Sequence, residues 1–146
     1  MSRLSPRLAA AVGALPLRPG LRVLEIGCGS GAAARAVAQL VGPDGHVLGV
    51  DRSERAVGTA IASSGGLIRA GLLRFVCTPV EDLVLPDDTP PFDLAVAIRV
   101  GAFDGRHPDL LDAALHRVRA ALRPGGPFYI DSPRPGIPLQ EIVVDT

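Results

Sequence analysis

The chain has 146 residues, 47% of them hydrophobic, and its 15 basic side chains balance 15 acidic ones. This length predicts one domain with a substantial core, and the zero net charge gives no indication of nucleic acid or an anionic membrane as the main partner. No apolar run approaches the roughly 20 residues of a membrane span. The two cysteines, Cys28 and Cys77, lack the spacing of metal ligands, so we expect no metal site and a reducing, cytoplasmic location.

The N-terminal segment, residues 1–19, has basic residues followed by an apolar run, and two interpretations fit it. A secretory leader begins in this way. An amphipathic helix also fits, with Ser5 as its cap and Pro6 at its first position. The face of that helix directed to the core would carry Leu4, Leu8, Ala11, Val12 and Leu15.

A glycine-rich turn organises the chain. Residues 22–31 read Arg-Val-Leu-Glu-Ile-Gly-Cys-Gly-Ser-Gly. Residues 23–26 have the apolar character of a buried strand, and residues 32–41 have the alanine-rich composition of a helix. The three glycines between them allow positive φ and place no Cβ between the backbone and a ligand, while the helix adds free N–H groups. This strand, turn and helix predict a site where a polar ligand lies against bare backbone.

Strands and helices alternate through the rest of the chain. Apolar runs predict four more strands and two more long helices, the strands at 46–50, 72–77, 94–100 and 128–130 and the helices at 54–63 and 109–122. Ser53 and Asp109 are expected to cap these two helices. Arg99 is the one charged residue in the apolar run of the fourth strand. The alternation predicts an α/β fold with a doubly wound, mostly parallel sheet in a three-layer αβα architecture.

Two classes of cofactor use such a glycine turn, nicotinamide or flavin dinucleotides and S-adenosylmethionine. Glu25, just before the first glycine, would repel a pyrophosphate but suits the ammonium of a methionine moiety. Asp51 ends the second strand, where a carboxylate accepts both hydroxyls of a ribose in either class. Residues 92–97 read Phe-Asp-Leu-Ala-Val-Ala, and residues 122–126 read Leu-Arg-Pro-Gly-Gly. Taken in this order, the four features resemble the class I S-adenosylmethionine-dependent methyltransferases across residues 20–132.

The resemblance implies a single domain with an N-terminal helix in residues 1–19, a cofactor-binding core in 20–132 and a proline-rich tail in 133–146. Members of the family usually add a helix and an antiparallel strand pair after the fifth strand. This tail has room for one short strand at 142–144, so we expect a core that lacks the usual last helix and strand pair. The fifth strand would then be an open sheet edge, to be covered by a tail strand or by a partner chain in a homodimer.

The resemblance also implies which residues contact the cofactor. The glycines would line its methionine and ribose portions, and Asp51 would bind the ribose hydroxyls, unless it only caps a helix. Arg52 would lie along the adenine or be a solvated arginine. The acidic residue that the family carries after the third strand is missing, so Glu81 or Asp82 either replaces it or only complements a helix dipole, and the N–H of Val80 would reach an adenine ring nitrogen. The full set of expected cofactor residues is Glu25, Gly27, Cys28, Gly29, Gly31, Asp51, Arg52, Val80, Glu81 and Ile98.

Methyl transfer from a sulfonium is an in-line displacement, for which a protein mainly supplies geometry and excludes water. A general base is needed only for an acceptor that is protonated at neutral pH. Arg99 is one candidate, which would attract an acidic substrate or pair with Glu81 or Asp104. Asp104 and Arg106 are further candidates in the same stretch. His107 is the last, placed either in a loop over the site or simply on the surface. The sequence lacks the Asn-Pro-Pro-Tyr motif of base-amino methyltransferases, which argues against nucleic acid as the acceptor.

These observations predict an enzyme that methylates a small molecule with S-adenosylmethionine and releases S-adenosylhomocysteine. Two alternatives stay open. The short tail suggests a non-catalytic cofactor-binding protein or a truncated methyltransferase, and the loose glycine pattern suggests a dinucleotide-dependent oxidoreductase, which Glu25 disfavours. Because the cofactor is cytosolic, we favour a helix over a leader at residues 1–19, and a cytoplasmic protein without membrane or nucleic-acid partners.

Overall fold

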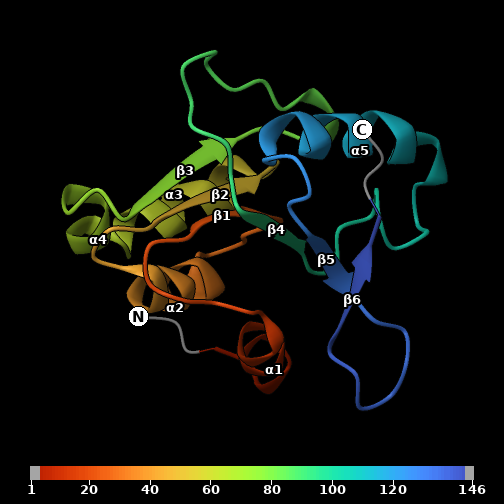
Figure 1. Cartoon of the computed structure of the whole chain (residues 1–146), viewed down its shortest axis with the longest axis horizontal. Helices are drawn as coiled ribbons and strands as arrows, with labels where there is room; N and C mark the ends of the chain where they lie inside the picture. Colours follow the sequence, from red (N-terminus) through yellow and green to blue (C-terminus); the bar gives the residue numbers. More distant parts are fainter. Residues whose placement is uncertain (1–3, 144–146) are drawn as a thin grey trace.

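The computed structural model describes residues 4–143 and contains one six-stranded sheet. Its strand order is β3-β2-β1-β4-β5-β6, with the first five strands in sequence parallel and β6 antiparallel to β5 (Figure 1). The strands are β1 (Arg22–Ile26), β2 (His46–Asp51), β3 (Leu73–Cys77), β4 (Leu94–Ala97), β5 (Phe128–Asp131) and β6 (Leu139–Ile142). This order confirms the prediction of a doubly wound, mostly parallel α/β sheet.

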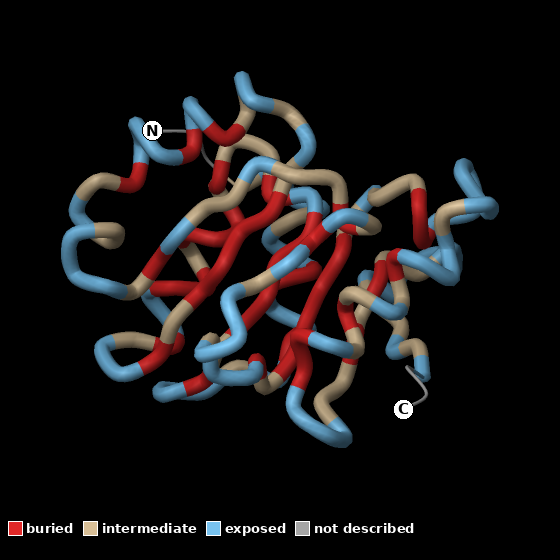
Figure 2. Tube along the Cα trace, turned by 90° about the horizontal axis from the view of Figure 1, so that it is seen from above, coloured by how far each residue is buried: buried red, intermediate tan, exposed pale blue. Residues whose placement is uncertain are grey.

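Helices cover both faces of the sheet. They are α1 (Pro6–Ala14), α2 (Ala32–Val41), α3 (Glu54–Ala62), α4 (Gly65–Arg69) and α5 (Leu111–Ala121). One core packs α1 and α2 against the face that carries Val23 and Val47, and a second core packs α5 against the face that carries Leu24 and Phe128. The strands are therefore buried through the centre of the molecule, and exposed segments lie mainly at its periphery (Figure 2). Within residues 4–143, no helix combines the length and the apolar character that crossing a membrane requires.

Two helices begin as the sequence predicts. The Ser5 hydroxyl accepts a hydrogen bond from the Leu8 N–H at 3.2 Å, and Pro6 opens α1. The Ser53 hydroxyl accepts one from the Ala56 N–H at 3.1 Å and caps α3. Each cap satisfies a backbone donor that the first turn of a helix leaves without an intrahelical partner.

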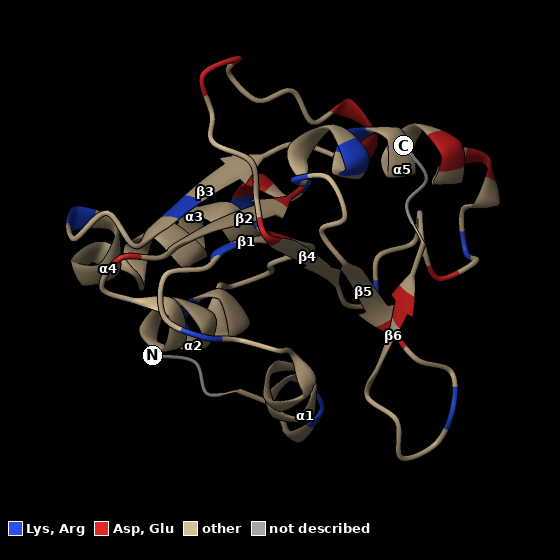
Figure 3. Cartoon of the chain, in the orientation of Figure 1, with Lys and Arg blue, Asp and Glu red and all other residues tan. Residues whose placement is uncertain are grey.

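The beginning of α5 differs from the prediction. Asp109 does not cap this helix, because a short 3₁₀ turn, Pro108–Leu110, precedes it. Leu110, at the capping position, already has helical backbone angles and makes no side-chain cap. Charge complements the dipole instead, with Asp112 in the first turn of α5 and Arg119 in its last turn (Figure 3).

The fourth strand is shorter than the apolar run that predicted it. β4 ends at Ala97, and Arg99 lies in the left-handed region with φ of 58°. Parallel pairing with β5 stops at the pair Ala97 and Ile130. We expected Arg99 to lie within the fourth strand. It lies instead in the loop that follows β4.

The tail supplies the strand that covers β5. β6 pairs antiparallel with the whole of β5, so β5 is not an open edge, and the outer strands of the sheet are β3 and β6. The strand begins three residues before the predicted segment 142–144, whose last residue lies outside the described residues. Antiparallel pairing needs only the short proline-containing turn at 132–138, which is why so short a tail suffices.

Candidate functional site

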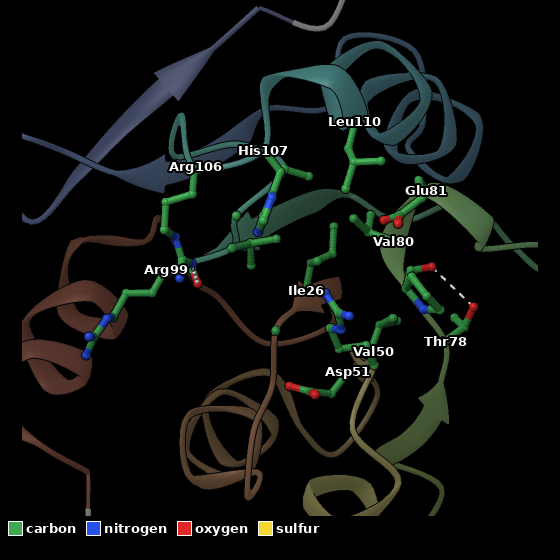
Figure 4. A pocket seen from close by; sticks show the side chains of 16 residues that line it. Ile26, Val50, Asp51, Thr78, Val80, Glu81, Arg99, Arg106, His107 and Leu110 are labelled. Atoms are coloured by element: carbon green, nitrogen blue, oxygen red, sulfur yellow. Dashed lines mark hydrogen bonds between the residues drawn. The ribbon is translucent and has the colours of Figure 1, made fainter.

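A cavity of about 250 Å³ opens at the carboxyl ends of β1, β2, β3 and β4 (Figure 4). Open parallel sheets bind ligands at this end, where the strand order changes direction. Here the change lies between the neighbours β1 and β4. From β1 the strand order runs through β2 and β3 to one edge of the sheet, and from β4 it runs through β5 and β6 to the other. The cavity is lined by Ile26, Gly27, Val50, Asp51, Arg52, Thr78, Pro79, Val80, Glu81, Arg99, Val100, Gly101, Ala102, Arg106, His107 and Leu110.

The glycine turn forms one wall of the cavity. Gly27 has φ of 76°, and its N–H donates to the Val50 carbonyl at 2.7 Å. A Cβ on Gly27 would lie 2.7 Å from the Cγ2 of Val100, so only glycine lets the turn and the loop after β4 come this close. Gly31 has φ of 88° and opens α2 without a side-chain cap. The turn therefore stands at the N-terminus of a helix, with Gly27 exposed and lining the cavity and Gly31 buried outside it.

Asp51 ties this turn to the end of β2. One of its carboxylate oxygens accepts the Gly29 N–H and the other accepts the Ser53 N–H, both at 2.9 Å. Ser53, and not Asp51, caps α3. Each carboxylate oxygen has two lone pairs, so Asp51 keeps acceptor capacity on the side that lines the cavity.

Glu25 lies buried behind the turn. Its side chain is on β1, the residue is only 5% exposed, and its Oε1 has no hydrogen-bond partner among the described residues. Burial, reinforced by the negative charge of Asp51, raises the pKa of Glu25 to about 7. The neighbouring Cys28 is also buried, and burial, together with the charges of Glu25 and Asp51, raises the pKa of its thiol. The thiol is therefore a packed group and not a nucleophile, and the two carboxyls create a site that a cation would stabilise.

The loop after β4 forms the opposite wall. Arg99 is exposed, and its side chain extends away from the cavity, which it lines only through its base (Figure 4). Its backbone is held at both ends: the N–H donates to Oδ1 of Asp131 at 3.1 Å, and the carbonyl accepts from Nη2 of Arg106 at 2.7 Å. In the described part of the chain, Arg99 forms no ion pair with Glu81 or Asp104. The predicted ion pair is therefore wrong, because the positive φ of Arg99 turns its side chain outward.

Arg106 takes the partner that we expected for Arg99. Its Nε lies 2.8 Å from one carboxylate oxygen of Asp104 and 3.0 Å from the other. Hydrogen bonds from Arg106 lower the pKa of Asp104. The next residue, His107, points its imidazole toward the cavity (Figure 4) and packs this ring on Gly101, whose carbonyl accepts the His107 N–H at 3.0 Å. The loop thus presents one histidine, and no free guanidinium, to the middle of the cleft.

Comparison with known proteins agrees with this geometry. Residues 23–126 match the methyltransferase domain family, which is most of the chain. The protein belongs to the class I S-adenosylmethionine-dependent methyltransferases.

Relatives of this chain act on different acceptors, according to their names. The chain is 33% identical over 109 residues to a probable cobalt-precorrin-6B C(15)-methyltransferase of Thermoplasma acidophilum, covering 75% of this chain and 51% of the relative. It is 35% identical over 133 residues to the ubiquinone/menaquinone C-methyltransferase UbiE of Ectopseudomonas mendocina, covering 89% and 49%. It is also 35% identical over 117 residues to a ribosomal RNA large subunit methyltransferase E of Syntrophobacter fumaroxidans, covering 77% and 57%.

A solved structure of an arsenic(III) S-adenosylmethionine methyltransferase from Chlamydomonas reinhardtii superimposes with a TM-score of 0.64 and 28% identity, covering 87% of this chain and 48% of that one. The chain spans about half the length of the curated relatives named above. The match therefore covers the shared core of these proteins and not their whole length.

The cleft collects only part of the residue set expected from the sequence. Seven of the predicted residues line it, namely Gly27, Asp51, Arg52, Val80, Glu81, Arg99 and His107. The others lie beside it without lining it, namely Glu25, Cys28, Gly29, Gly31 and Ile98. Among residues 4–143, no three His, Cys, Asp or Glu side chains are grouped so as to hold a metal ion.

Several residues of this region escaped the sequence analysis: Val100, Gly101, Ala102 and Leu110 line the cavity, and Asp131 supports it without lining it. Asp131 ends β5 and holds the backbone of Arg99, from which it is separated by 32 residues. No local pattern marks it, since Asp131 reads as an ordinary polar residue between a strand and a turn. Only its position at a parallel strand end, next to the end of β4, could have suggested a role.

Proposed function

We propose that this protein binds S-adenosylmethionine in the cleft and transfers its methyl group to a small-molecule acceptor, leaving S-adenosylhomocysteine. The observation that carries the proposal is the buried Oε1 of Glu25, which has no hydrogen-bond partner among the described residues. The negative charge of Asp51 also raises the pKa of this carboxyl. A pyrophosphate would add negative charge to this pair of carboxyls, whereas an ammonium or sulfonium group would neutralise it. The site therefore fits a cationic ligand better than a dinucleotide.

The residues present fit the parts of this cofactor. The exposed backbone at Gly27, and the half-buried backbone at Gly29 beside the cavity, would lie against its methionine and ribose portions, and Asp51 would accept the ribose hydroxyls. Arg52, Val80 and Glu81 line the cavity beyond β2 and would surround the adenine. When bound, S-adenosylmethionine supplies an electrophilic methyl group on a sulfonium.

The protein's own contribution to the reaction lies at the other wall. Val100, Ala102 and Leu110 line it with apolar atoms and would exclude water from the acceptor. The imidazole of His107 points into the same space and would accept a proton from an acceptor that carries one at neutral pH (Figure 4). Arg99, with its side chain turned outward, is assigned no contact with the acceptor.

Two of the named relatives methylate small molecules, according to their names, which supports a small-molecule acceptor. The third is named as a ribosomal RNA methyltransferase, so relatives of this chain also include an enzyme that acts on RNA. The absence of nucleic-acid and membrane partners and the cytoplasmic location stay predictions. A homodimer through a sheet edge is likewise a prediction, and the outer strands open to it in residues 4–143 are β3 and β6.

Isothermal titration calorimetry tests the proposal. We expect S-adenosylhomocysteine to bind with one site per chain and NADH neither to bind nor to compete. Asp44, an exposed acid in the turn before β2, offers a control, since Asp44→Ala should leave the affinity unchanged. Saturable NADH binding that S-adenosylhomocysteine displaces would contradict the proposal, and so would a folded protein that binds neither compound.

A further inference from the structure

We infer that Asp131 is a positioning residue, whose carboxylate holds the loop 98–107 in the conformation that presents His107 to the acceptor end of the cleft. The inference rests on the proposed function, which assigns this end of the cleft to the acceptor. The conformation of the loop can be measured without any acceptor. It concerns a residue at the end of β5 that does not itself line the cavity.

The first argument is the backbone of Arg99. A non-glycine residue with φ of 58° is in a disfavoured backbone conformation, so contacts with the rest of the protein must hold it there. Oδ1 of Asp131 accepts the Arg99 N–H at 3.1 Å, and the side chain that supplies this oxygen is 16% exposed. The side chain of Arg99 takes no part, since it extends away from the cavity (Figure 4).

The second argument is that the loop is closed on itself from this point. The Arg99 carbonyl accepts a hydrogen bond from the guanidinium of Arg106, which also forms an ion pair with Asp104. The Val100 carbonyl accepts the N–H groups of Phe103 and Asp104, and the Gly101 carbonyl accepts that of His107. A loop with this many internal hydrogen bonds moves as a unit, so the anchor at Arg99 sets where the imidazole of His107 lies.

The third argument is that the anchor is itself oriented. The second oxygen of Asp131 accepts from Nη2 of Arg7, in the first turn of α1, at 2.9 Å. Arg7 is 54% exposed, so this ion pair contributes little stability, and its loss should leave the bond to Arg99 in place. The two contacts of one carboxylate can thus be removed separately.

Three variants separate the contacts. Asp131→Ala removes both, Asp131→Asn keeps an oxygen that can accept the Arg99 N–H, and Arg7→Ala removes only the ion pair. The measurements use the free protein: hydrogen exchange of the amides in residues 99–107, and the NMR resonance of the His107 ring, with the rings of His46 and His116 as internal references.

We expect Asp131→Ala to speed exchange at the Arg99 amide by about tenfold or more and to shift the His107 ring resonance, with both effects largely reversed in Asp131→Asn. Arg7→Ala should leave both readouts as in the wild type. An unchanged His107 resonance in Asp131→Ala, no rescue by Asp131→Asn, or an equal change in Arg7→Ala would overturn the inference. Titration of each variant with S-adenosylhomocysteine keeps the two proposals apart, because its failure to bind the wild type would reject the proposed function without altering these readouts.

Discussion

The two walls of the cleft are built in different ways. The methionine and ribose part of the wall assigned to the cofactor belongs to one β-α-β unit, and its key side-chain bond joins Gly29 to Asp51, 22 residues apart. The wall assigned to the acceptor depends on Asp131, which holds Arg99 across 32 residues and Arg7 across 124. The first wall is largely bare backbone in left-handed glycine conformations, and the second is a loop fixed by side chains from other elements.

This difference predicts which property each wall controls. Backbone groups that are held by a strand, a turn and a helix have little freedom to adapt, so changes there should alter cofactor affinity directly. A loop held by a few side-chain bonds can be moved without disturbing the sheet, so changes there should alter the acceptor end and leave the cofactor alone. The predictions below test this division, in order of expected effect.

The largest effect is expected for Asp51→Ala. The change removes an acceptor for ribose hydroxyls and frees the N–H groups of Gly29 and Ser53, which Asp51 now binds. Charge-assisted hydrogen bonds contribute ~1.5–3 kcal/mol each, part of which water replaces, so S-adenosylhomocysteine should bind about tenfold to a hundredfold more weakly by calorimetry. Full affinity in a folded variant would show that Asp51 serves only the local turn.

Gly27→Ala tests the contact between the two walls. A Cβ there meets Val100 at 2.7 Å and stands at φ of 76°, so we expect the free energy of unfolding to fall by ~1–3 kcal/mol in urea titrations and the cofactor to bind more weakly. Gly58→Ala is the matched control. Gly58 lies within α3, with open space around its Cβ position, and its replacement should raise stability by ~1 kcal/mol. Equal effects of the two substitutions would mean that the walls do not touch as described.

Glu25 gives the cofactor wall a pH dependence. Its pKa of about 7 means that a cationic ligand must displace a proton below this pH, so affinity for S-adenosylhomocysteine should rise by about tenfold between about pH 6 and 8. Glu25→Gln should remove the rise. A pH-independent wild type would contradict the assignment of Glu25 to a ligand cation.

The same group should affect stability in the opposite direction. The folded pKa of Glu25 lies above its usual value of 4.5, so the folded state holds a proton that the unfolded state loses between these values. Stability is therefore greatest below about pH 4.5 as far as this group is concerned, and it falls as the pH rises through about 7. At about pH 8, Glu25→Gln should unfold at a free energy ~1–3 kcal/mol higher than the wild type, and the difference should shrink toward about pH 5.

The smallest effect is expected for Arg99→Leu. The exposed side chain points away from the cleft, and the bonds at this position come from the backbone, which leucine keeps. Melting temperature and cofactor affinity should stay close to those of the wild type. A shift of the His107 ring resonance comparable with that expected for Asp131→Ala would show that the guanidinium, and not the backbone, anchors the loop.

Much of the cofactor wall was predictable because its signals are local. The glycine spacing, the apolar strand before it and the serine caps of α1 and α3 each depend on residues a few positions apart, and the structure confirms them. Asp109 failed as a predicted cap because a 3₁₀ turn also fits the sequence after Pro108. The residues that line the cleft could be named only for the strand ends, where topology brings them together.

The sequence by itself determined the α/β alternation, the glycine turn and the separate acidic residues Glu25 and Asp51, since hydrophobic period, positive φ and charge are properties of single residues or close neighbours. The fold brought the two carboxyls within reach of each other's charge. Tertiary structure decided that β4 ends at Ala97, that Arg99 turns outward and that the tail covers β5. It also brought Asp131 to Arg99. In each case two backbone conformations compete, such as a longer strand β4 against a left-handed turn at Arg99 that Asp131 stabilises. The conformation with the lower free energy depends on residues from distant parts of the chain, so no local pattern indicates it.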